Sequence, residues 1–209
     1  NFLCIYFFHF DPHMANIIFN IALLSYFISA LGYTFYLVYR ESIVNLISAF
    51  ALGLGLISHT ITIGLRSAET GHGPYTTGFE IASFLAWVIV VIFFLTEWKY
   101  KIKDLGTFVI PVVFLILFYS AFQSREVLLI DDSSTMFWLT MHRTLSIIGY
   151  AAFAIAFGGA LMYLIQENQV KSKKLGVMYF RMPSLEVLDD LNYKVIAIGF
   201  PLFTLGFMT

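Results

Sequence analysis

The sequence contains little cysteine and little charge: it has one cysteine, Cys4, and 12% charged residues among 209. Soluble domains carry about 25% charged residues, roughly twice as many. A single cysteine excludes an internal disulfide, a Cys-x-x-Cys redox pair and a zinc site built from several cysteines. The net charge of −1 offers no basic excess for nucleic acid. The short motifs of serine hydrolases, zinc proteases, P-loop enzymes and dinucleotide-binding folds do not occur.

Apolar residues, in contrast, are abundant. They make up 59% of the chain, with 23 Phe and 12 Tyr, and the mean hydropathy is +0.83. A soluble globule of this length cannot bury so many apolar side chains. About 20 apolar residues suffice for a helix to cross a hydrocarbon core of ~30 Å. We therefore predict an all-α, polytopic transmembrane bundle of six helices, over residues 17–39, 43–65, 79–98, 105–122, about 144–165, and from about 193 to 209.

The basic residues are divided unequally between the two sets of loops. Nine of the twelve follow the first, third and fifth runs or precede the sixth: Arg40, Lys99, Lys101, Lys103, Lys171, Lys173, Lys174, Arg181 and Lys194. The opposite side has Arg66, Arg125 and Arg143. Because basic loops stay in the cytoplasm, we predict that the N-terminus and the loops 66–79 and 123–142 face outward.

The two ends of the sequence favour a division into two parts. Residue 1 is Asn, and Met14 leads directly into the first apolar run, so residues 1–13 are expected to be an upstream or frayed segment. The sixth run is still apolar at Thr209, so further helices are expected beyond it. We interpret 14–209 as the N-terminal part of a larger membrane domain.

Two local patterns predict packing and capping. Gly149, Ala152, Ala156 and Ala160 recur at helical spacing in the fifth run, with Gly158 and Gly159 nearby, which favours close helix packing in lipid. In the loop 167–192, Ser184 is a candidate N-cap with Glu186 in the first turn. This predicts a short helix, 184–190, at the cytoplasmic surface.

Two histidines lie around the second apolar run. His59 is within it, beside Ser58 and Thr60, and is either a hydrogen-bonded structural residue or a ligand or proton carrier. His72, in the outer loop, is expected to shape the loop or to be exposed. Their separation is close to the spacing of stacked haem ligands, but glycine and proline around His72 break the helix, so we reject a cytochrome b arrangement. His9 and His13 are expected to have no role.

Charged and aromatic residues at the outer boundary complete the candidates. His142 lies where the fifth helix enters the membrane and is either an interfacial anchor or an axial ligand of haem iron. Arg143 beside it could offset a haem propionate, and Trp138 would share its helix face if the helix begins early. Glu80 opens the third helix, where a carboxylate is favourable by itself, and could pair with Arg66 across the loop.

Three stretches together resemble one family: residues 59–87, 139–153 and 181–206, the last with a Pro-Ser-Leu-Glu loop followed by a Gly-Phe-Pro helix. They are similar to the CcsA (ResC-type) cytochrome c biogenesis proteins of the haem-handling superfamily. The resemblance implies that haem (haem b) is carried to the outer face and attached to the CxxCH motif of apocytochrome c. His142 matches the first of the family's two outer axial histidines. Arg66, His72 and Glu80 are expected to support the outer haem region.

The resemblance also implies partners and a location. A CcsB (ResB-type) membrane subunit and a thioredoxin-like thiol reductant are expected, the latter because this chain has no thiol pair. The location is the bacterial inner membrane, or the thylakoid in a plastid. The complex would be a cytochrome c haem lyase, with residues 1–209 alone inactive. Two alternatives stay open: a HemX-like accessory protein of the haem pathway, and a transporter or structural subunit without haem, which would show no Soret band.

Overall fold

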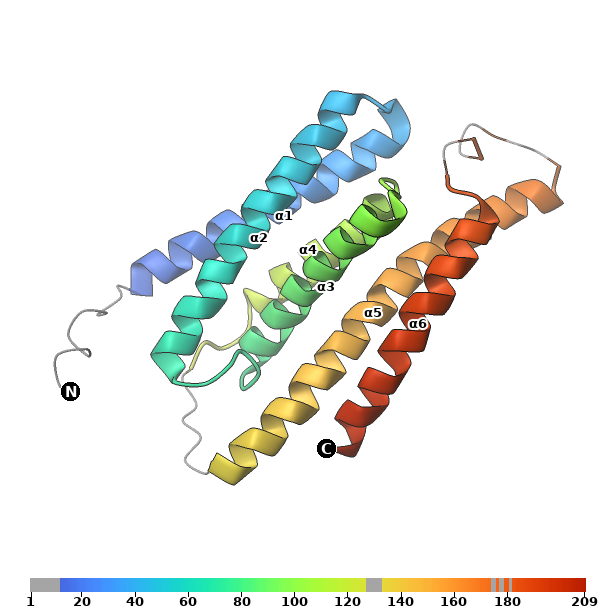
Figure 1. Ribbon diagram of the computed structural model, residues 1–209. Coiled ribbons are helices and arrows are strands. Elements are labelled where there is room, and N and C mark those ends of the chain that lie inside the picture. Colours follow the sequence, from blue (N-terminus) through green and yellow to red (C-terminus); the bar gives the residue numbers. More distant parts are fainter. Residues whose placement is uncertain (1–11, 127–132, 174–175, 177–178, 181) are drawn as a thin grey trace.

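The computed structural model describes residues 12–126, 133–173, 176, 179–180 and 182–209, without the side chains of 12, 13 and 133–136. His9, the side chain of His13 and most of the expected upstream segment lie outside this description. The predicted all-helical bundle is confirmed, and the described residues contain no strand. Its six helices run up and down side by side (Figure 1): α1 (Pro12–Tyr39), α2 (Ser42–Thr70), α3 (Gly78–Tyr100), α4 (Leu105–Ser120), α5 (Ser133–Lys171) and α6 (Leu185–Met208).

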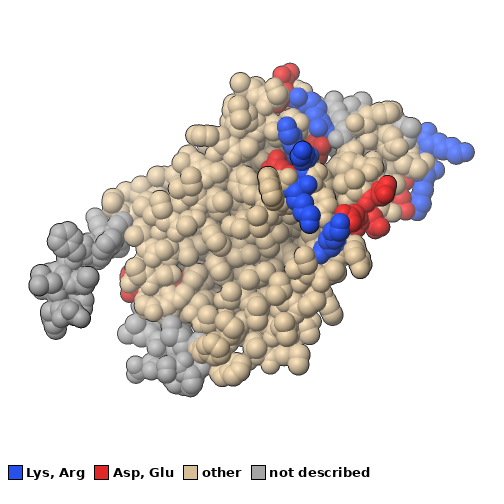
Figure 2. Space-filling view, in the orientation of Figure 1, with Lys and Arg blue, Asp and Glu red and all other residues tan. Residues whose placement is uncertain are grey.

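Five of these helices are long and apolar enough to cross a membrane, so the protein is a multi-pass membrane protein. The exception, α4, has 16 residues, about 24 Å of helix. It packs against α1, α3 and α5, which leaves several of its side chains fully buried, including Leu105, Ile110 and Leu117. Charged side chains gather at the end of the molecule that holds the α1–α2 turn and the α3–α4 loop (Figure 2).

Two helix starts differ most from the prediction. The short surface helix expected at 184–190 is wrong as a separate element, because these residues are the first turns of α6. Ser184 does cap the helix, accepting a hydrogen bond from the Val187 amide, and Asp190 pairs with Lys194 at 2.7 Å one turn later. α5 begins at Ser133 rather than near Thr144. In both cases the helix begins before the apolar run. Hydropathy detects the apolar run but not the polar turns of helix that precede it.

The small residues of α5 and α6 let the two helices approach closely, as predicted. A Cβ added to Gly149 would lie 2.6 Å from Phe203 Cβ, and one added to Gly199 would lie 2.6 Å from Ala152 Cβ. A Cβ on Gly206 would meet the backbone nitrogen of Ser146 at 2.6 Å. Because lipid tails are as apolar as the helices, such close contact is a main source of helix association in membranes.

The α5–α6 contact gives a first testable prediction. Replacing Gly149 by leucine is expected to destabilise the protein by about 1–3 kcal/mol, since the backbone of α6 must move to admit the side chain. Gly53→Leu is the matched control, because nothing lies within 4 Å of an added Cβ there. Thermal unfolding in detergent measures both variants. Equal stability of the two would contradict close packing at Gly149.

Candidate functional site

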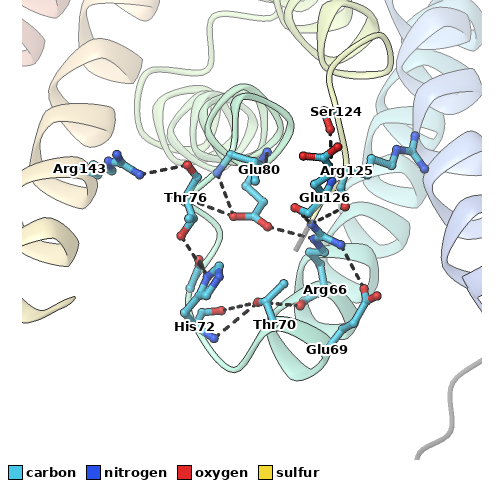
Figure 3. A network of polar contacts seen from close by, with 12 residues as sticks. Arg66, Glu69, Thr70, His72, Thr76, Glu80, Ser124, Arg125, Glu126 and Arg143 are labelled. Atoms are coloured by element: carbon cyan, nitrogen blue, oxygen red, sulfur yellow. Dashed lines mark hydrogen bonds and ion pairs between the residues drawn. The ribbon is translucent and has the colours of Figure 1, made fainter. Parts of the chain in front are cut away.

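The loop between α2 and α3 is fixed at both ends by local sequence. α2 ends at Gly71, whose φ of 74° is a left-handed conformation that favours glycine. α3 begins with a capping box, in which the Thr77 hydroxyl accepts from the Glu80 amide and the Glu80 carboxylate accepts from the Thr77 amide. The loop is therefore short and held in one conformation against the helix ends (Figure 3).

Glu80 and Arg66 form a buried ion pair beneath this loop. Arg66 Nε donates to Glu80 Oε1 at 2.9 Å, and the two side chains are 11% and 1% exposed. The second carboxylate oxygen accepts from the backbone amides of Thr76 and Thr77, at 3.0 and 3.3 Å. Arg66 also contacts Glu69, at 3.2 Å. The pairing expected from the sequence is confirmed, and both carboxylate oxygens of Glu80 are hydrogen-bonded.

Arg66 also connects this network to the segment that follows α4. Its Nη2 donates to the Arg125 carbonyl at 2.8 Å. The Arg125 guanidinium lies over the rings of both Phe19 and Phe79, 4.8 and 4.6 Å from their centroids, and donates to Asn16 Oδ1. Burial, together with the positive charge of Arg66, lowers the Arg125 pKa from its ordinary value. Four segments thus meet at this end of the bundle.

His72 lies inside the loop and is 6% exposed. Its Nδ1 donates to the Gly73 carbonyl at 2.8 Å and lies 3.2 Å from the Thr76 hydroxyl. The Thr70 hydroxyl donates to the His72 carbonyl at 3.3 Å. Of the two expectations for this residue, the loop-shaping one is confirmed and exposure is not observed.

α5 contacts the same loop from the other side. Arg143 Nη1 donates to the carbonyls of Tyr75 and Thr76, the latter at 3.3 Å. The Thr140 hydroxyl, almost one turn earlier on α5, donates to the Tyr75 hydroxyl at 2.6 Å. The position of this part of α5 is therefore set by the loop that Arg66 and Glu80 hold (Figure 3).

His142 lies beside this contact but faces a groove between α3 and α5. The groove has a volume of about 360 Å³. The imidazole is half-buried and makes no hydrogen bond to any residue that the structure describes. Trp138 lies four residues earlier on the same helix face and is 56% exposed. The groove is lined by Ile81, Leu85, His142, Arg143, Ser146, Ile147 and Tyr150.

The six predicted site residues therefore fall into two neighbouring groups. Arg66, His72 and Glu80 share the loop network, and Arg143 joins them, whereas His142 faces the groove and Trp138 the surface of α5. The sequence prediction missed Tyr75, Thr76 and Thr140, which connect the two groups. One sequence signal could have predicted part of this arrangement: the Thr-x-x-Glu pattern from Thr77 to Glu80 is typical of a capping box at a helix start.

His59 lies apart from both groups, in the core of the bundle, and is fully buried. Its Nε2 lies 2.8 Å from the Ser83 hydroxyl of α3, and its Nδ1 lies 3.3 Å from the Tyr26 hydroxyl of α1. Both ring nitrogens are therefore satisfied by side chains from different helices, as membrane-buried histidines require. This geometry supports the structural interpretation of His59, in which it ties three helices together.

Comparison with known proteins places this arrangement in a family context. Residues 75–209 match the profile described as "Cytochrome C assembly protein". A cytochrome c biogenesis protein CcsA of Guillardia theta is 26% identical, over 90% of this chain and 69% of its own length. The CcsA of Prochlorococcus marinus strain MIT 9301 is 30% identical, over 78% and 61%. The protein HemX of Brevibacillus brevis is 27% identical, over 68% and 52%. No solved structure matches.

Proposed function

Because this chain belongs to the cytochrome c assembly protein family and is a membrane subunit of cytochrome c biogenesis, we propose that it delivers haem to the outer face for attachment to apocytochrome c. The acceptor is the CxxCH motif, and the haem is haem b. The chain spans between about half and two thirds of the relatives it matches, so the complete reaction is proposed for the full-length protein.

The observation that carries this proposal is the position of His142. A half-buried imidazole without a hydrogen-bond partner among the described residues faces a groove with mainly apolar walls. Haem iron is commonly held by histidine, and the porphyrin needs apolar surroundings. The groove volume of about 360 Å³ is at the lower end of ligand sites. It would therefore hold one face of the haem, with His142 as one axial ligand and the second ligand supplied from elsewhere.

The neighbouring residues support this role by position and charge. One terminal nitrogen of Arg143 donates to the loop carbonyls. Arg143 also lines the groove, where its positive charge would stabilise a haem propionate. Trp138, on the same face of α5, offers an exposed ring for stacking against the macrocycle. Arg66, Glu80 and His72 act indirectly in this proposal, since they hold the loop against which Arg143 is positioned.

The chemistry of attachment defines the partners and the side of the membrane. Joining the haem vinyl groups to the CxxCH thiols requires that both thiols are reduced, and this chain has one cysteine. A thioredoxin-like reductant and a CcsB (ResB-type) subunit therefore belong to the proposed complex. The positive-inside rule supports an orientation in which the N-terminus and the His142 end face outward. The membrane is the bacterial inner membrane, or the thylakoid membrane in a plastid.

An attachment assay tests the proposal. The full-length protein is purified with its CcsB-type partner from haem-replete membranes and mixed with reduced apocytochrome c. We expect a Soret band in the purified complex and covalent haem on the acceptor, measured by absorption and by haem staining after denaturing electrophoresis. Apocytochrome c with both CxxCH cysteines replaced by alanine is the control and should remain unlabelled.

Two other results would favour the alternatives. The similarity to a HemX protein supports a second candidate, an accessory protein that controls enzyme levels in the haem pathway. That function predicts altered amounts of haem-synthesis enzymes on deletion, with no covalent labelling of the acceptor in the assay. The absence of a Soret band with the partner present would favour a transporter or structural subunit.

A further inference from the structure

A second groove opens on the membrane-facing surface near the opposite, basic end of the bundle. It lies where α5 packs against both α3 and α6 (Figure 1), and its volume is about 310 Å³. It is distinct from the His142 groove, with which it shares no lining residue. Its walls are almost entirely apolar and include Ile92 and Leu95 of α3, Ile148 and Ala152 of α5, and Val195 and Ile198 of α6.

The length of this groove matches one leaflet of a bilayer. On α6 its lining extends from Lys194 to Leu202, eight residues or about 12 Å along the helix. One leaflet contributes about 15 Å of hydrocarbon, half of the ~30 Å core. The groove therefore follows the membrane depth over which an acyl chain lies, and its apolar walls suit such a chain.

Two lysines line the basic end of the groove. Lys99 lies in the last turn of α3 and Lys194 lies in α6, and their ammonium groups are 5.6 and 6.0 Å from the centre of the same ring, that of Tyr100. Lys194 also pairs with Asp190 at 2.7 Å. Lys99 makes no ion pair within the part of the chain that the structure describes. One carboxylate for two ammonium groups leaves a net positive charge at the mouth of an apolar groove.

We propose that this groove binds an anionic phospholipid from the leaflet on the basic side of the membrane. An acyl chain lies along α5 between α3 and α6, and the phosphate is held by Lys99 and Lys194. Basic pockets between transmembrane helices on the cytoplasmic side are known to recognise anionic headgroups. The charge favours an anionic over a zwitterionic headgroup, and the apolar walls require a ligand with a hydrocarbon tail. The proposal does not depend on haem delivery.

Lipid titration followed by native mass spectrometry tests this site. The full-length protein, stripped of lipid in detergent, is titrated with dioleoyl-phosphatidylglycerol and separately with dioleoyl-phosphatidylcholine. We expect tighter binding of phosphatidylglycerol and about a tenfold weakening in the double variant Lys99→Gln/Lys194→Gln, because both ammonium groups are lost. The variant Lys99→Arg/Lys194→Arg keeps the charge and should keep the binding.

The matched control removes the same charge outside the groove. Lys101→Gln/Lys103→Gln lies at the same end of the bundle but lines a different hollow, and should bind like the wild type. Thermal unfolding confirms that each variant is folded. Equal weakening in both double glutamine variants would show only general attraction to a basic surface and would overturn the proposal. So would equal affinity for the two lipids, or displacement of the lipid by equimolar haem.

Discussion

Replacing His142 by glycine is expected to weaken the Soret band of the full-length protein, purified with the proposed CcsB-type partner, by about tenfold or more. In the proposed role of His142 as an axial ligand, the substitution removes the iron–nitrogen bond. The loss should be large, because even the residues that only orient metal ligands contribute 10–100-fold to affinity. Glycine leaves the space of the imidazole empty, so added imidazole is expected to enter it and restore the band. Absorption spectra at equal protein concentration, with and without imidazole, measure both effects.

Ser146→Gly is the matched control for His142→Gly. Ser146 lines the same groove about one turn further along α5, so this variant introduces the same glycine into the same helix without removing an imidazole. It should keep the Soret band, and imidazole should not change it. A band that is unaltered by His142→Gly would remove His142 from the site and direct attention to His72.

Arg66→Ala is expected to give the largest loss of stability, about 3–5 kcal/mol, because it leaves a buried carboxylate without its partner. Glu80 is 1% exposed, so its charge is stabilised by the guanidinium and the loop amides rather than by bulk water. The variant also removes the hydrogen bond to the Arg125 carbonyl, which holds the segment after α4. Unfolding in detergent, followed by circular dichroism with increasing denaturant, measures the change.

Two further variants test whether the loss of stability comes from the unpaired buried charge. Arg66→Met/Glu80→Gln removes both charges at similar volume and should recover a large part of the lost stability, because no unpaired ion remains. Lys171→Ala breaks the exposed ion pair with Glu167, 2.9 Å apart on α5, and should change stability little. If Arg66→Ala were as mild as Lys171→Ala, the buried pair would not be holding the loop.

The sequence predicted those features that depend on neighbouring residues in the chain. Apolar runs of membrane length determined the all-helical, multi-pass architecture, because unpaired backbone groups are not tolerated in lipid. Ser184 marked a helix start through a cap that needs no distant partner, and the glycine and proline around His72 marked a break in the helix. The same local patterns placed a carboxylate, Glu80, at a helix start. The family resemblance, carried by continuous stretches of sequence, was likewise confirmed.

Only the tertiary structure decided which of these residues meet. His72 is buried rather than exposed because the α2–α3 loop folds over it, and His59 is satisfied by Tyr26 and Ser83, 33 and 24 residues away. Arg143 contacts loop carbonyls 67 and 68 residues earlier. Such contacts arise from the packing of whole helices. Hydropathy and spacing record the direction of each helix and the extent of its apolar part but not its rotation, and rotation determines which side chains share a groove.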